Sequence, residues 1–295
     1  MRIEATLEHM APTIGVFDSG FGGLTVLRAL IQRIPRARYA FLGDTARLPY
    51  GSKSRRTIAR YAAQSAQFLV REQGAEFLVI ACNTASALAM EPIQEAVQDA
   101  VPAIPVLGVI EPGATAARAA SQTGDVLVIA TDATVQSHAY AAACRANGLR
   151  AFEKACPLLV PLVEEGWTSH PVTEQVIRVY LDELIAEATA QGLNPDTLVL
   201  GCTHYPLLRP LIEQVLARSA RPGIRVIDSA ESTADAALRL FNGRAGGRAA
   251  PSAGGTAQQT EVRCFATDSV EKFEQLGSRF LERPVGTVQL VDLGG

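Results

Sequence analysis

Two short segments of this chain look like copies of one another: Leu78-Val-Ile-Ala-Cys-Asn-Thr84 and Leu198-Val-Leu-Gly-Cys-Thr-His204. Each starts as an apolar run of β-type residues and stops at a small residue, a cysteine and a polar pair. A helix-like pattern follows each run. Cys82 and Cys202 stand at the same place in the two copies. The sequence therefore predicts two related strand–turn–helix units, each with a thiol where the strand ends and the helix begins.

Paired thiols of this kind suggest two acid/base groups that face one substrate from opposite sides, the geometry needed to invert a carbon centre. A thiol has an unperturbed pKa of about 8.5, and a helix N-terminus favours the thiolate. The polar residues after each cysteine could cap the following helix or donate to a bound carboxylate. Capping alone would explain a single copy, whereas two copies favour a function.

Composition bounds the class of protein. The chain has 295 residues, 48% of them hydrophobic and 19% charged, which predicts about two domains with sizeable cores. A net charge of −3 gives no sign of nucleic acid or an anionic membrane surface as a partner. No stretch is long and apolar enough for a membrane helix. The first eleven residues lack an apolar signal core, so we expect a cytoplasmic protein.

Neither a disulfide framework nor a bound cofactor is expected. The five cysteines are widely spaced without a C-x-x-C pair, which argues against disulfides and a zinc knuckle. Cys144, Cys156 and Cys264 are interpreted as buried free thiols. None of the three lysines lies in a glycine-rich cofactor context, so a pyridoxal Schiff base is not expected. We predict no metal and no cofactor.

Strand and helix patterns alternate along the chain and predict an α/β fold of doubly wound, mainly parallel sheets. The expected strands cover residues 13–17, 39–42, 77–81, 126–130, 197–200 and 225–227. The expected helices cover 23–34, 54–73, 85–99, 134–147, 172–191, 208–219 and 232–241. A last strand–helix–strand unit covers 261–290. Ligands of such sheets lie at the carboxyl ends of the strands.

The repeat extends beyond the cysteines, because residues 14–19 and 126–131 open similar β–loop–α units. We expect two pseudo-symmetric lobes with the active site in the cleft between them. The first would comprise residues 1–107 and 222–295, and the second, inserted, residues 108–221. The Pro-rich stretches at 101–106 and 221–223 are the expected crossings. Residues 243–258 have few bulky apolar side chains and are interpreted as a flexible loop.

The loop after the first strand holds Asp18 and Ser19, followed by Gly20-Phe-Gly-Gly23. The glycines allow a tight turn and close approach to a ligand. Asp18 could bind an amino group or orient Cys82, or it could simply cap a helix. A dinucleotide site is the competing interpretation, but position 25 is threonine where the G-x-G-x-x-G fingerprint requires glycine.

Two further loops carry candidates. His204 could share a proton with Cys202 or hold the thiol in the right state. Tyr50 and Gly51 follow the second strand at the same edge of the sheet, where their backbone groups could bind a side-chain carboxylate. An ordinary turn is the alternative for this loop.

Several blocks then match a known family in order over residues 13–241: Phe17-Asp-Ser-Gly-Phe-Gly-Gly-Leu-Thr-Val26, Gly43-Asp-Thr-Ala-Arg-Leu-Pro-Tyr-Gly51, Ala81-Cys-Asn-Thr-Ala85, Val109-Ile-Glu-Pro-Gly113, Thr131-x-x-Thr134-Val-x-Ser137 and Gly201-Cys-Thr-His-Tyr-Pro206. The chain resembles the cofactor-independent glutamate racemases of the aspartate/glutamate racemase superfamily. It departs from them in Ala130, where glycine is common, and in its long Gly/Ala-rich loop at 243–258.

The resemblance implies an isomerase that interconverts L-glutamate and D-glutamate and supplies D-glutamate for peptidoglycan. Cys82 and Cys202 would be the two bases, Cys82 acting on the D-enantiomer and Cys202 on the L-enantiomer. Asp18 and His204 would belong to the catalytic machinery. Substrate contacts would come from Asp18, Ser19, Tyr50, Gly51, Asn83, Thr84, Thr131, Thr134, Thr203 and His204.

Other interpretations stay open. A single-thiol decarboxylase would use one cysteine, an amino-acid-binding protein would share the cleft, and a dehydrogenase would bind a dinucleotide. The sequence leaves open whether the chain forms a homodimer. Glu111 is either a helix-start acid or part of a subunit contact, and Glu164 either an auxiliary acid or a solvated charge.

Overall fold

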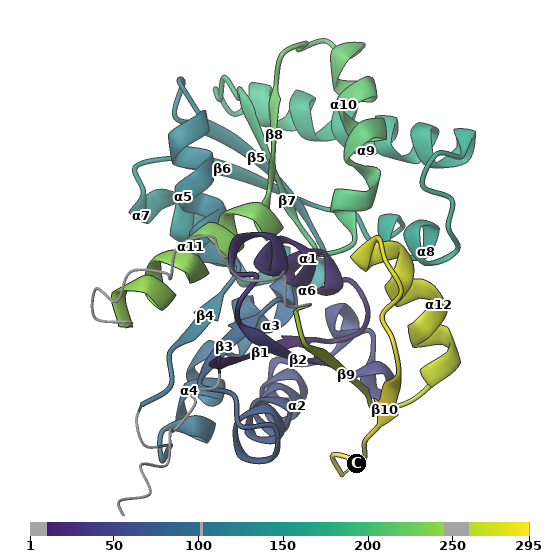
Figure 1. Ribbon diagram of the computed structural model, residues 1–295. Helices are drawn as coiled ribbons and strands as arrows, with labels where there is room; N and C mark the ends of the chain where they lie inside the picture. The colour runs from purple at the N-terminus through teal and green to yellow at the C-terminus, as the bar shows by residue number, and fades with distance from the viewer. Residues whose placement is uncertain (1–10, 101–102, 245–259, 295) are drawn as a thin grey trace, which may run out of the picture.

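Two parallel sheets form the centre of the protein (Figure 1). The computed structural model describes residues 11–100, 103–244 and 260–294. One sheet has six strands in the order β10-β9-β2-β1-β3-β4, and the other has four in the order β6-β5-β7-β8. The strands are β1 (Thr13–Asp18), β2 (Arg38–Gly43), β3 (Phe77–Ile80), β4 (Val106–Gly108), β5 (Asp125–Ala130), β6 (Arg150–Ala155), β7 (Thr197–Gly201), β8 (Arg225–Asp228), β9 (Val262–Ala266) and β10 (Val288–Leu290).

Helices follow the strands and pack on both sides of the sheets (Figure 1). They are α1 (Leu24–Arg33), α2 (Arg55–Gln67), α3 (Asn83–Leu88), α4 (Met90–Val97), α5 (Ile110–Ala120), α6 (Asp132–Ser137), α7 (Ala139–Ala146), α8 (Leu159–Glu164), α9 (Pro171–Ala190), α10 (Arg209–Ala217), α11 (Ser229–Arg244) and α12 (Val270–Leu281). Every residue of the central strands β1, β3, β5 and β7 is buried, as apolar strands between helix layers must be. The prediction of an α/β fold with two lobes, each built on a parallel sheet, is confirmed.

The two halves repeat one topology. The order β2-β1-β3-β4 in the first sheet is matched by β6-β5-β7-β8 in the second. The cysteine-bearing strands β3 and β7 therefore hold equivalent places, each beside the strand that opens its half. Because both sheets are parallel, the loops after β1 and β3 emerge at the carboxyl edge of the first sheet, and those after β5 and β7 at the carboxyl edge of the second.

The C-terminal part returns to the first sheet. Helix α11 packs against α1 and α5, and β9 pairs with β2. The crossing predicted at residues 221–223 precedes β8, which pairs with β7 in the second sheet. We therefore propose that the chain crosses back after β8. Phe273 of α12 is fully buried between Phe21 and Phe41, which joins the last helix to the first half.

The structure differs from the predicted elements at two strands and four helices, of which α5 and α8 were not predicted at all. Strand β4 was not expected because the stretch around it is rich in proline, and β6 was not expected because its sequence is charged. The helix predicted over 134–147 is broken at His138, whose φ of 53° is left-handed. The helix predicted over 85–99 is interrupted at Ala89. Most of the loop predicted at 243–258 lies outside the described residues.

None of the described helices is long and apolar enough to cross a membrane.

Candidate active site

The carboxyl ends of β1, β3, β5 and β7 surround one cavity of about 390 Å³. Most residues singled out in the sequence line it: Ser19, Tyr50, Gly51, Cys82, Asn83, Thr84, Thr131, Cys202, Thr203 and His204. Asp18 and Thr134 lie behind this lining, Asp18 next to Ser19 and Thr134 hydrogen-bonded to Thr84. The structure thus brings the two halves of the repeat to one cavity.

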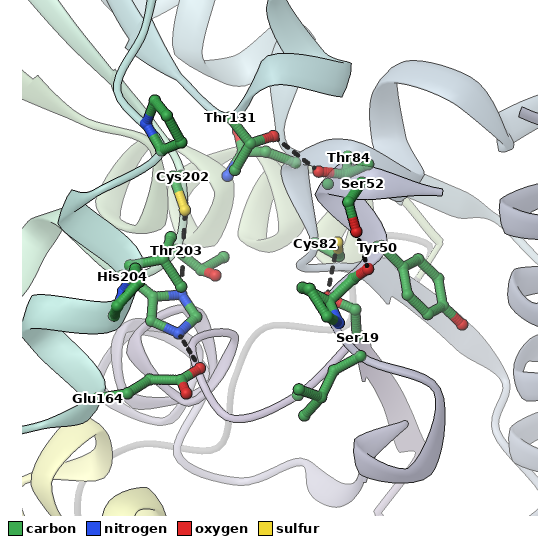
Figure 2. Close-up of a pocket in the computed structure, with 18 of the residues that line it drawn as sticks. Ser19, Tyr50, Ser52, Cys82, Thr84, Thr131, Glu164, Cys202, Thr203 and His204 are labelled. Carbon is green, nitrogen blue, oxygen red and sulfur yellow. Dashed lines mark hydrogen bonds and ion pairs between the residues drawn. The ribbon is translucent and has the colours of Figure 1, made fainter. Parts of the chain in front are cut away.

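Cys82 is the N-cap of the short helix α3, where its sulfur accepts the N–H of Ala85 at 3.5 Å. Its sulfur also lies 3.3 Å from the Ser19 hydroxyl (Figure 2). These contacts lower the pKa of Cys82 and so favour the thiolate, as the sequence suggests, but burial has the larger effect. Burial first, and then the negative charge of Asp18, raise the pKa of Cys82 to about 12. A proton is therefore held firmly at this thiol.

Cys202 has a different neighbour. Its sulfur lies 3.9 Å from Nδ1 of His204, and Nε2 of the same ring lies 3.3 Å from Oε1 of Glu164 (Figure 2). Burial opposes a charge on His204, but hydrogen bonds to Cys202 and Glu164 outweigh it and raise its pKa to about 10. Cys202 therefore lies beside a protonated imidazole, a positive group that the Cys82 side lacks.

Asp18 is wholly buried at the end of β1. Oδ2 accepts the N–H of Gly20 at 2.9 Å, while Oδ1 has no hydrogen-bond partner in the described part of the chain. Burial raises the pKa of Asp18, and the charge of His204 and hydrogen bonds from main-chain N–H groups oppose this rise. A buried carboxylate oxygen without a partner is costly, and a ligand's positive group would satisfy it.

Three threonine hydroxyls join the halves of the molecule. Thr84 follows the first cysteine loop, whereas Thr131 and Thr134 belong to the second half. Their Oγ1 atoms lie 3.0–3.3 Å apart in a closed triangle. The triangle holds the Cys82 loop against the loop after β5 and gives the cavity wall hydroxyl donors.

Tyr50 reaches the cavity differently from its neighbours. Its ring points away from both sulfur atoms (Figure 2), and its hydroxyl donates to the buried carboxylate of Asp44. Asp44 also binds Arg47 through both oxygens at 2.8 Å and accepts from Thr267 at 2.9 Å. Asp44 thus anchors the loop, so only the main chain around Tyr50 and Gly51 is left to meet a ligand.

The glycine turn after β1 serves packing between the loops. A Cβ on Gly22 would lie 2.2 Å from Oγ1 of Thr203 and 2.7 Å from Nδ1 of His204, and one on Gly23 would lie 2.5 Å from the Cβ of Asp18. The glycines therefore let the first loop touch the Cys202 loop. Asp44 is hydrogen-bonded to Arg47, Tyr50 and Thr267, and the buried Asp18 places a carboxyl group at the turn, so the turn does not favour a dinucleotide.

The sequence did not identify several residues around the cavity. Glu164, left open there, contacts His204, and Lys272 of α12 lies 3.8 Å from Glu164. Pro157, Val160 and Pro161 form an apolar wall beside it. Their positions depend on contacts between distant segments, for which the local sequence carries no signal. Among the described residues, no three His, Cys, Asp or Glu side chains gather as a metal site would require.

The chain is similar to known proteins along nearly its whole length. Residues 14–237 match the family model described as Asp/Glu/Hydantoin racemase. A glutamate racemase of Koribacter versatilis (strain Ellin345) is 51% identical over 304 residues, covering 98% of this chain and 100% of that protein. The crystal structure of glutamate racemase from Francisella tularensis subsp. tularensis SCHU S4 in complex with D-glutamate has a TM-score of 0.81 at 34% identity, covering 96% of this chain and 98% of that chain. That of glutamate racemase from Thermus thermophilus in complex with beta-chloro-D-alanine has a TM-score of 0.77 at 41% identity, with the same coverage.

Proposed function

Because the chain belongs to the Asp/Glu/hydantoin racemase family, we propose that it interconverts L-glutamate and D-glutamate with Cys82 and Cys202 as its two bases. One observation carries the proposal: two thiols at equivalent places of a repeated fold line the same cavity. A one-thiol reaction would need only one of them. Cys82 and Cys202 are both almost fully buried, so a substrate held between them is shielded from water.

The different neighbours of the two thiols support different roles for them. In the direction from L- to D-glutamate, Cys202 as thiolate takes the α-proton, and the thiol of Cys82 protonates the opposite face. The protonated His204 stabilises the thiolate of Cys202 by its charge, and the raised pKa of Cys82 keeps a proton ready there. In the reverse direction, the two cysteines exchange roles.

The cavity offers partners for the rest of the substrate. Glutamate carries an ammonium group and two carboxylates. The unpartnered Oδ1 of Asp18 fits the ammonium, and the Nδ2 of Asn83, also buried without a partner in the described part of the chain, fits the α-carboxylate. Hydroxyls of Thr84 and Thr203 add donors that stabilise the carbanion as charge moves into this carboxylate. The main chain at Gly51 is the proposed site of the side-chain carboxylate.

The scheme needs only these side chains, so we propose that no cofactor takes part. As the family implies, the D-glutamate formed would enter peptidoglycan synthesis in the cytoplasm. A homodimer is the assembly to test, by light scattering of the purified protein.

The test is racemisation of L-glutamate by the purified protein without added cofactor, followed by circular dichroism. Cys82→Ser and Cys202→Ser should each abolish turnover while D-glutamate still binds, since serine keeps the shape but is a far weaker acid. Cys264→Ser is the control, because this buried thiol lies in β9 away from the cavity. Full activity in either active-site variant would refute the two-thiol scheme.

A further inference from the structure

Tyr140 of α7 touches the neighbours of both catalytic cysteines. The side chain is fully buried. Its ring packs on Gly201, the residue before Cys202: a Cβ there would lie 2.9 Å from Cε2 of Tyr140. Its hydroxyl donates to Oδ1 of Asn83, the residue after Cys82, at 2.7 Å. One side chain thus connects the two loops that carry the thiols.

This hydrogen bond determines which end of the Asn83 amide faces the cavity. An amide has one acceptor end and one donor end. Tyr140 occupies the acceptor Oδ1, while the donor Nδ2 is buried without a partner in the described part of the chain. The Ser229 side chain is a further polar neighbour of the Tyr140 oxygen. The hydroxyl proton of Tyr140 is donated to Asn83.

We propose that Tyr140 is a positioning residue that holds the Asn83 amide with its NH₂ group toward the α-carboxylate of the substrate. The inference rests on the proposed function, because it assumes an amino-acid carboxylate in the cavity. A reversed amide would turn Oδ1, a partial negative charge, toward that carboxylate and repel it. Since Asn83 follows Cys82 directly, the same hydrogen bond also ties the first cysteine loop to the second half.

Burial makes the arrangement independent of pH. Desolvation raises the pKa of Tyr140 far above its ordinary value, and the neighbouring Ser229 side chain opposes this only in part. The hydroxyl therefore keeps its proton throughout the range in which the enzyme would work. Its removal should change substrate affinity without moving the pH profile.

Tyr140→Phe tests the proposal, because it removes only the hydroxyl. We expect kcat/KM for glutamate to fall about tenfold in each direction, the size expected for one hydrogen bond to a charged group. The change should lie mainly in KM, since the carboxylate is present in the bound substrate as well as in the transition state. Tyr39→Phe is the matched control: its hydroxyl is equally buried but donates to the main-chain carbonyls of Leu30 and Ile34. This control should keep the KM of the parent protein.

A double-mutant cycle separates positioning from packing. Asn83→Ala should lower kcat/KM more than Tyr140→Phe does, and adding Tyr140→Phe to it should cause no further loss. A tenfold loss that persists in the Asn83→Ala background, or an unchanged KM in Tyr140→Phe, would overturn the proposal.

A second variant keeps the test decisive if Tyr140→Phe does not fold. Ser229→Ala removes a polar neighbour of the Tyr140 hydroxyl, and it should raise KM about threefold, again only when Asn83 is present. An unchanged KM in this variant would contradict the inference. If the parent protein itself did not racemise glutamate, the proposed function would fail instead, so the two failures are distinguishable.

Discussion

Removing the charge of Glu164 should slow proton transfer at Cys202 and spare proton transfer at Cys82. Oε1 of Glu164 lies 3.3 Å from Nε2 of His204 and helps to raise the pKa of that imidazole from 6.5 to about 10. At this distance an effective dielectric constant of about 20 gives an upper limit of ~5 kcal/mol. Partial exposure of Glu164 lowers the value, and we take ~2 kcal/mol. In Glu164→Gln the pKa of His204 should therefore fall by about 1.5.

The kinetic result follows from the symmetry of the reaction. L- and D-glutamate have equal free energies, so kcat/KM must fall by the same factor in both directions, about 30-fold above pH 10, where the lower pKa of His204 removes most of the protonated form. Proton transfer at Cys202 becomes the slower step. The primary isotope effect should therefore rise with α-deuterated L-glutamate, from which Cys202 takes the deuteron. With α-deuterated D-glutamate, handled by Cys82, it should fall toward unity.

The assay is circular dichroism with each deuterated enantiomer between pH 6 and 11. The alkaline limb of kcat/KM reports loss of the proton from His204, so it should move to lower pH in Glu164→Gln. Glu95→Gln is the control, because it removes the same charge from an exposed position on α4 that does not line the cavity. Isotope effects that change equally with both enantiomers, or an alkaline limb that does not move, would refute the assignment of Glu164 to the Cys202 side.

Three further outcomes are expected. Gly22→Ala places a methyl group 2.2 Å from Oγ1 of Thr203 and should lower kcat/KM by 100-fold or more, on the order of 3 kcal/mol, whereas Gly20→Ala meets nothing nearer than 3.5 Å and should stay active. Phe273→Ala should lower the free energy of unfolding by about 3–5 kcal/mol in urea titrations, because the ring is fully buried; a smaller cost would contradict the docking of α12. The pKa of His204 is about 10 in the folded protein, above its ordinary value of 6.5, so the folded state holds a proton that the unfolded chain loses. The free energy of unfolding should therefore fall as pH rises from 6.5 to 10, less steeply in Glu164→Gln; equal slopes in urea titrations would contradict this.

The central strands were predictable because their signals are local. Strands β1, β3, β5 and β7 are continuous apolar runs, and each was expected within one residue of its observed bounds. The edge strands were harder. Strand β4 has three residues after a proline, and β6 carries Arg150, Glu153 and Lys154, so neither shows the pattern of a buried strand. These edge strands form because each pairs with a neighbouring strand, and the local sequence carries no signal of that pairing.

The residues of the candidate site were likewise predictable only where their signal is local. The thiols were identifiable because the repeat places Cys82 and Cys202 at equivalent strand ends. The contacts of groups that act on other side chains were not: Tyr140 reaches Asn83 across 57 residues, and Glu164, for which the sequence left two alternatives, reaches His204 across 40. Such contacts appear only when the two halves are assembled, so no spacing rule along the chain could predict them.

The most direct test of the central claim is the fate of the α-hydrogen in D₂O. L-Glutamate is incubated with the protein, and both enantiomers are separated early in the reaction and analysed by mass spectrometry. If Cys202 removes the proton and Cys82 delivers another, the D-glutamate should carry one deuterium and the remaining L-glutamate should still carry protium. D-Glutamate that retains the original hydrogen would show that a single group moves it between faces, and the two-thiol account would be wrong.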